Sequence, residues 1–134
     1  LRTKGKSRTR IYTNDHRRHL GEPQIIKIPE NTFDFPLELM LNLLAHEMVH
    51  VSQKMKGNVV EDKNEREWQA YYEMLFHPKF PQIPELPDFH KRFFANKALE
   101  YYNRMAEGSQ IRLKYALQKQ EIDNLLSLLD TKMK

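Results

Sequence analysis

Residues 43–53 read LLAHEMVHVSQ and place two histidines and an acid inside an otherwise apolar, helical stretch. On a helix, His46 and His50 lie about 40° apart, so both imidazoles can bind one metal ion. The chain contains no cysteine, which leaves histidine and carboxylate as its strong ligands. Glu47 is rotated by about 100° from His46, within reach of a water molecule on that ion. The stretch therefore predicts a zinc site with Glu47 as general base.

The helix that carries these residues is expected to be buried nearly all round, because apolar side chains fill most of positions 37–51. Burying two imidazoles and a carboxylate without partners would cost on the order of several kcal/mol. A bound metal ion removes that cost. The alternative is a pair of core histidines whose hydrogen bonds are satisfied by neighbouring groups.

A short strand is predicted before the histidine helix. Residues 23–29, PQIIKIP, alternate apolar and polar positions between two prolines. The helix itself is expected to start at Asp34, which can cap it, with a proline in the first turn. It should run to about residue 56, where Gly57 supplies a stop.

Helices are also predicted for most of the rest of the chain. Asp62 can cap a second helix that ends before Pro78. Four prolines at intervals of three residues then make an extended connector. Asp88 is expected to cap a third helix, and a fourth helix is predicted over residues 111–129.

The third metal ligand is expected from the second helix, because a catalytic zinc takes three protein ligands and keeps one open position. Candidates are Glu67, Glu65 and Glu61. Glu67 is favoured because Ala70, one turn later on the same face, permits a close approach to the histidine helix. Glu65 lies two positions away and is expected to point to solvent or to cap the helix start.

The motif HEMVH, followed by a helix with EWQAY, resembles the gluzincin branch of the zinc metallopeptidases. It is also similar to the small metallopeptidases of the phage-repressor-cleaving type, in which a short strand and a HExxH helix precede a glutamate helix. The resemblance covers about residues 23–78. It implies that His46, His50 and Glu67 bind zinc and that Glu47 is the general base. Tyr71 stands where the family often has an acid that orients a ligand histidine.

The predicted fold class is α+β and mostly helical. We expect a minimal zincin-like domain, with a short strand or small sheet before the HExxH helix and a C-terminal helical extension. Residues 1–22 would form a basic arm, residues 23–78 the catalytic core, and residues 79–134 the proline-rich connector and the C-terminal helices.

Composition indicates a single globular domain. The chain has 134 residues, 40% hydrophobic and 30% charged, and no apolar run approaches the roughly 20 residues that span a bilayer. A soluble, cytoplasmic protein is expected, because the chain lacks cysteine and its first residues are basic rather than apolar.

The net charge of +4 comes from the N-terminal arm. Residues 1–20 hold seven basic side chains and one acid, which leaves 15 basic and 17 acidic residues in the remainder. The arm therefore predicts contact with an acidic partner or with nucleic acid, and the domain itself does not.

These features predict a hydrolase, a zinc metallopeptidase that cuts a protein or peptide substrate with a water molecule activated by zinc and Glu47. The alternative is a zincin-like structural or binding module, without activity, in a larger assembly. A side chain that stabilises the oxyanion is also expected; the candidates are Tyr71, Tyr72, His77 and His90.

Overall fold

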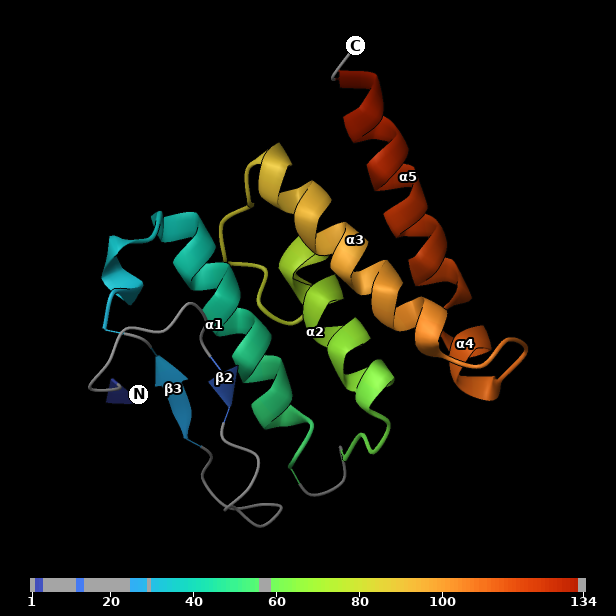
Figure 1. Cartoon of the computed structure of the whole chain (residues 1–134), viewed down its shortest axis with the longest axis horizontal. Coiled ribbons are helices and arrows are strands. Elements are labelled where there is room, and N and C mark those ends of the chain that lie inside the picture. The colour runs from blue at the N-terminus through green and yellow to red at the C-terminus, as the bar shows by residue number, and fades with distance from the viewer. Residues whose placement is uncertain (1, 4–11, 14–24, 29, 56–58, 133–134) are drawn as a thin grey trace.

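The computed structural model describes residues 2–3, 12–13, 25–28, 30–55 and 59–132, and these residues are mostly helical (Figure 1). The predicted fold class, α+β and mostly helical, is confirmed. None of the helices in these ranges is both long and apolar enough to cross a membrane. The α-helices are α1 (Leu37–Ser52), α2 (Lys63–Phe76), α3 (Asp88–Arg104), α4 (Gln110–Lys114) and α5 (Ala116–Lys132).

Three short strands, β1 (Arg2–Thr3), β2 (Tyr12–Thr13) and β3 (Ile26–Ile28), form a small sheet. The order is β1-β3-β2, with β1 parallel and β2 antiparallel to β3. β3 lies inside the strand predicted at residues 23–29. The sheet lies on one side of α1 and α2 on the other (Figure 1).

Part of the predicted arm, residues 1–22, belongs to this sheet. No strand was predicted in the arm, yet residues 2–3 and 12–13 pair with β3. Strands of two residues are too short for alternation to reveal them, since a recognisable pattern needs about four residues or more. The rest of the arm lies outside the described residues, so its role in partner binding stays a prediction.

Helix α1 is shorter than predicted at both ends. Asp34 does not cap it, because that residue closes the short 3₁₀ helix η1 (Thr32–Asp34), and Pro36 takes the cap position. The helix ends at Ser52 rather than near residue 56. At this end the Ser52 hydroxyl donates to the carbonyl of Val49 within the last turn, and the backbone N–H of Val60, from beyond the helix, donates to the carbonyl of Gln53.

The apolar sequence of α1 predicted a helix buried nearly all round, and this prediction was wrong. Leu37 is 59% exposed and Met48 39% exposed. Several of the buried residues of α1 are polar. The buried residues are Asn42, Ala45, His46, Glu47 and Val49. One side of α1 therefore presents its polar residues to the interior, which is the side that carries the candidate site.

The bounds of α2 agree with the sequence signals. The Asp62 carboxylate accepts a hydrogen bond from the backbone N–H of Glu65 at 2.8 Å, so the predicted N-cap is confirmed. The helix ends at Phe76, and His77 adopts a left-handed conformation with φ 53° directly before Pro78. The His77 Nε2 atom lies 2.6 Å from Asn42 Oδ1, which ties this end of α2 to α1.

The C-terminal helices differ from the prediction in two details. Asp88 is the first residue of α3 and not its cap, since Pro87 occupies that position. The single helix predicted over residues 111–129 is divided at Tyr115 into α4 and α5. Gly108, with φ 71°, makes the turn before α4, and the Ser109 hydroxyl caps that helix.

The main hydrophobic core lies among α2, α3 and α5. Trp68 is fully buried, and its indole N–H donates to Gln118 at 3.2 Å. The core therefore joins helices from both sides of residue 78. Its buried members are Trp68, Tyr72, Met74, Leu75, Leu86, Phe94, Ala95, Ala98, Met105, Tyr115 and Ile122.

Candidate metal centre

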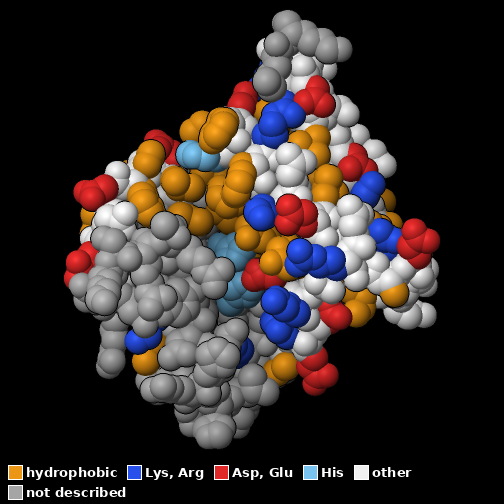
Figure 2. Space-filling view, viewed as in Figure 1, with side chains coloured by type: hydrophobic (Ala, Val, Ile, Leu, Met, Phe, Trp, Pro, Cys, Tyr) orange, Lys and Arg blue, Asp and Glu red, His pale blue; other side chains and the backbone are white. Residues whose placement is uncertain are grey.

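Helix α1 holds the two motif histidines side by side. The Nε2 atoms of His46 and His50 are 3.2 Å apart, and the rings meet edge to face with centroids 4.8 Å apart. His46 is 7% exposed, and His50 is half-buried. On the face seen in Figure 2, histidine side chains reach the surface near the middle, beside acidic and hydrophobic side chains. The helical spacing of four thus produces the convergence that was predicted from it.

Helix α2 brings one carboxylate to these histidines, that of Glu67. Its Oε1 atom is 2.8 Å from His50 Nε2, and its Oε2 atom is 3.7 Å from His46 Nε2. The side chain of Glu65 is turned toward Tyr115 instead, and Glu61 is exposed. Of the three glutamates proposed from the sequence, Glu67 is the one placed at the site.

Glu47 completes the group. It is 6% exposed, and its Oε2 atom lies 3.9 Å from His46 Nε2. The potential ligand atoms of His46, Glu47 and His50 all lie within 4.8 Å of one another. The described residues therefore include a group that could hold a metal ion.

The charges at the site are coupled. Burial alone would raise the pKa of the Glu67 carboxyl. Hydrogen bonds from His46 and His50 outweigh burial and hold that pKa well below its ordinary value. Burial likewise works against a charged His50, but the hydrogen bond and the charge of Glu67 outweigh it and raise the pKa of that imidazole. The titration of Glu67 is thus coupled to that of His50.

The two histidines differ in their outer contacts. The His50 Nδ1 atom lies 2.9 Å from Gln53 Oε1, whereas the buried Nδ1 of His46 has no hydrogen-bond partner among the described residues. The ring of Tyr71 packs edge to face on His46, with centroids 4.5 Å apart. At the position where the gluzincins often have an acid that orients a ligand histidine, this chain places the ring of Tyr71 against His46. The contact of Gln53 was not predicted, although its position three residues after His50 puts it on the same helix face.

The four residues proposed to stabilise an oxyanion occupy different environments. The Tyr72 hydroxyl donates to Glu121 at 2.8 Å, and His77 is paired with Asn42. His90 packs against aromatic residues of α3. Of these four residues, Tyr71 is the one in contact with a motif histidine.

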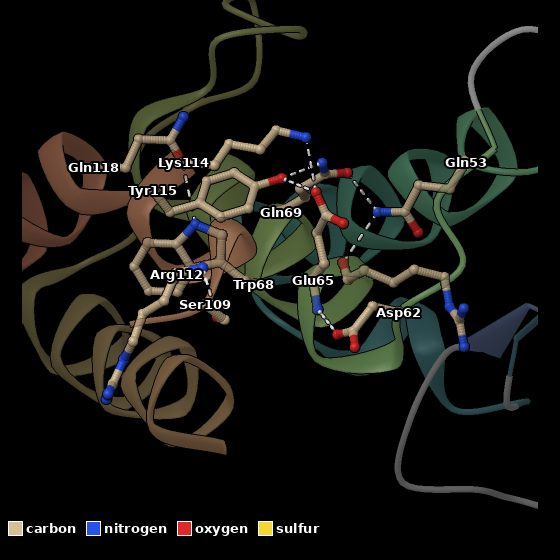
Figure 3. A network of polar contacts seen from close by, with 11 residues as sticks. Gln53, Asp62, Glu65, Trp68, Gln69, Ser109, Arg112, Lys114, Tyr115 and Gln118 are labelled. Atoms are coloured by element: carbon tan, nitrogen blue, oxygen red, sulfur yellow. Dashed lines mark hydrogen bonds and ion pairs between the residues drawn. The ribbon is translucent and has the colours of Figure 1, made fainter. Parts of the chain in front are cut away.

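Glu65 corrects one expectation. It does not point to solvent but is 9% exposed, and its Oε2 atom accepts hydrogen bonds from the Tyr115 hydroxyl at 2.6 Å and from Lys114 Nζ at 2.9 Å (Figure 3). The pKa of Tyr115 is raised above its ordinary value, mainly by burial and to a lesser extent by the hydrogen bond to the Glu65 carboxylate. Glu65 therefore fastens α2 to the segment where α4 meets α5.

Replacing Glu65 by alanine is accordingly expected to lower the free energy of unfolding by about 1–3 kcal/mol, because the buried Tyr115 hydroxyl loses its acceptor. Urea unfolding of the metal-free protein measures this change. The control is Glu61→Ala, which removes an exposed carboxylate from just before the same helix and should cost less than about 0.5 kcal/mol. Equal effects of the two substitutions would contradict the assigned role of Glu65.

In comparisons with known proteins, the chain matches no family model, no curated protein and no solved structure. The likeness to gluzincins thus rests on HEMVH and EWQAY alone. The arrangement of the side chains is the remaining guide to function.

Proposed function

We propose that the chain is a zinc-dependent metallopeptidase in which His46, His50 and Glu67 bind the metal ion and Glu47 is the general base. The observation that carries this proposal is the convergence of three ligand side chains from two helices, with a fourth, acidic side chain beside them. A closed structural zinc site would need no buried carboxylate in that fourth place.

The distances suit zinc. Tetrahedral ligands that lie about 2.0–2.1 Å from a zinc ion are about 3.3 Å from one another. The three separations among the nearest nitrogen and oxygen atoms of His46, His50 and Glu67 are 3.2, 2.8 and 3.7 Å. Small side-chain adjustments would therefore place all three atoms around one ion. Two imidazoles and one carboxylate are also a common ligand set of catalytic zinc.

When bound, zinc would supply Lewis-acid activation of water and of the peptide carbonyl group. Glu47 then accepts a proton from the attacking water as the new carbon–oxygen bond forms. As the carbon–nitrogen bond breaks, the same carboxyl group returns the proton to the amine nitrogen. The low exposure of Glu47 favours this proton transfer, because little bulk water competes for it.

A peptide is the substrate class best supported by the surroundings of α1. Strand β2 contacts α1, and within the described sheet it pairs on one side alone. An extended peptide can add to such an edge as a further strand, which would hold it straight beside α1.

Zinc content is the first test. The purified chain is expected to bind about one zinc ion per molecule, measured by mass spectrometry of the intact protein at neutral pH, where unprotonated imidazoles can act as ligands. His46→Ala should lose the ion. The matched control is His90→Ala, because His90 lies on α3 and is not a member of the group. A wild-type chain that is free of zinc and refuses added zinc would refute the proposal.

A further inference from the structure

A chain of hydrogen bonds leads from His50 away from the candidate metal centre. Gln53 Oε1 lies 2.9 Å from His50 Nδ1, and Gln53 Nε2 lies 2.9 Å from Gln69 Oε1. Gln69 Nε2 lies 2.6 Å from the Tyr115 hydroxyl, which in turn contacts Glu65 at 2.6 Å. Figure 3 shows Gln53, Gln69, Tyr115 and Glu65 turned toward one another across α1, α2 and the junction of α4 with α5.

The orientation of the Gln53 amide is fixed by its own partners. Its nitrogen donates to two acceptors, the backbone carbonyl of Arg66 at 3.0 Å and Gln69 Oε1, which uses both of its hydrogens. The amide oxygen therefore faces His50, and an amide oxygen can only accept. Consequently Nδ1 of His50 donates to Gln53, and Nε2, which lies 2.8 Å from Glu67 Oε1, is the nitrogen that would bind a metal ion once it has given up the hydrogen shared with Glu67.

Glu65, at the far end of this series of hydrogen bonds, sets the donor and the acceptor of each bond in it. An ionised carboxylate accepts but does not donate, so the Tyr115 hydroxyl donates to Glu65. The same hydroxyl then accepts from Gln69, which accepts from Gln53, which accepts from His50. Lys114 compensates the charge of Glu65 from 2.9 Å. All donors thus point from the imidazole toward a buried carboxylate.

We propose that Gln53 is a positioning residue that sets the tautomer and the ring orientation of His50 for metal binding. Gln69, Tyr115 and Glu65 hold its amide in the required orientation. The low exposure of Gln53, 2%, fits this role, because a glutamine at a helix end is ordinarily exposed. The inference rests on the proposed zinc site and assigns to it a support that extends into the C-terminal helices.

The test compares Gln53→Met with Gln118→Met, which removes a glutamine of the same polar region. Gln118 accepts from Trp68, which is not a member of the series of hydrogen bonds that begins at His50. Zinc affinity, measured by competition with a chelator, is expected to fall about 10- to 100-fold in Gln53→Met and less than about threefold in the control. Equal affinities of wild type and Gln53→Met would overturn the inference and leave the proposed zinc site intact.

A spectroscopic readout separates positioning from packing. In long-range ¹H–¹⁵N spectra, wild type should show a hydrogen-bonded Nδ1–H of His50 that exchanges slowly with water, and Gln53→Met should lose that signal. If wild type binds no zinc, the proposed function fails. The same spectra of the metal-free protein still test whether Gln53 positions His50. Identical His50 signals in both proteins would overturn the positioning role. Gln53→Asn, whose shorter side chain withdraws the acceptor, replaces Gln53→Met if the latter does not fold.

Discussion

Glu47→Gln is expected to lower the rate of peptide hydrolysis by about 10²- to 10⁴-fold while zinc stays bound. Glutamine preserves the shape of the side chain but cannot take a proton from water, and general acid–base catalysis by one group is worth about that much. The rate is kcat/KM on a peptide that wild type cleaves, found by screening a peptide library. Metal content is measured on the same samples, so that a lost ion is not mistaken for a lost base.

The control for this substitution is Glu61→Gln, an exposed change of the same chemistry that should leave the rate unaltered. A Glu47→Gln variant that cleaves at the wild-type rate would show that Glu47 is not the base. A wild-type chain that holds zinc but cuts no peptide in the library would favour the structural or binding module instead.

Glu67→Ala is expected to weaken zinc binding by more than about a hundredfold, because two imidazoles alone hold the ion poorly. The affinity is measured by competition with a chelator. Glu61→Ala is the matched control, since that carboxylate is exposed and has no contact with the histidines among the described residues. Zinc affinity unchanged by Glu67→Ala would mean that another group is the third ligand, and the zincin interpretation would then need Glu47 or an undescribed residue in that place.

The same variant should change the titration of the metal-free site. Without the Glu67 carboxylate, the pKa of His50 is expected to fall from its raised value toward the ordinary one, as followed by NMR of the imidazole. The pair stabilises the metal-free fold while Glu67 is ionised and His50 is charged. This contribution is therefore lost at low pH, as pH falls through the lowered pKa of Glu67, and again as pH rises through the raised pKa of His50.

The pairing of His46 with His50 was predictable from the sequence, because it depends on the geometry of a single helix. The spacing of His46 and His50 fixes their relative rotation on α1. Choosing Glu67 over Glu65 needed one further argument, that the small, fully buried Ala70 marks the face of α2 that faces inward. The structure turns Glu67 to the histidines, although its role as a ligand stays a prediction.

Other features depend on contacts between distant parts of the chain, which a pattern of neighbouring residues does not contain. Glu65 is buried because Tyr115 and Lys114 reach it, and no local signal distinguishes it from an exposed capping residue. At the early end of α1, the backbone N–H of Val60 donates to the carbonyl of Gln53, which a longer helix would have used for its own bond. Strands β1 and β2 exist through pairing with β3, and their two residues show no period of their own.

The hydrogen bonds that brace α2 join residues far apart along the sequence. Trp68 and Gln118 are 50 positions apart, as are Glu65 and Tyr115, and Gln69 and Tyr115 are 46 apart. A ribosome that has made residues 1–78 has therefore made every proposed metal ligand and the proposed base, but none of the partners that fix α2 from its other side. Contacts of such long range form late, because the intervening loop must first be closed. The nascent chain would thus gain the contacts that hold α2, and with it the side chain of Glu67, only after α5 emerges.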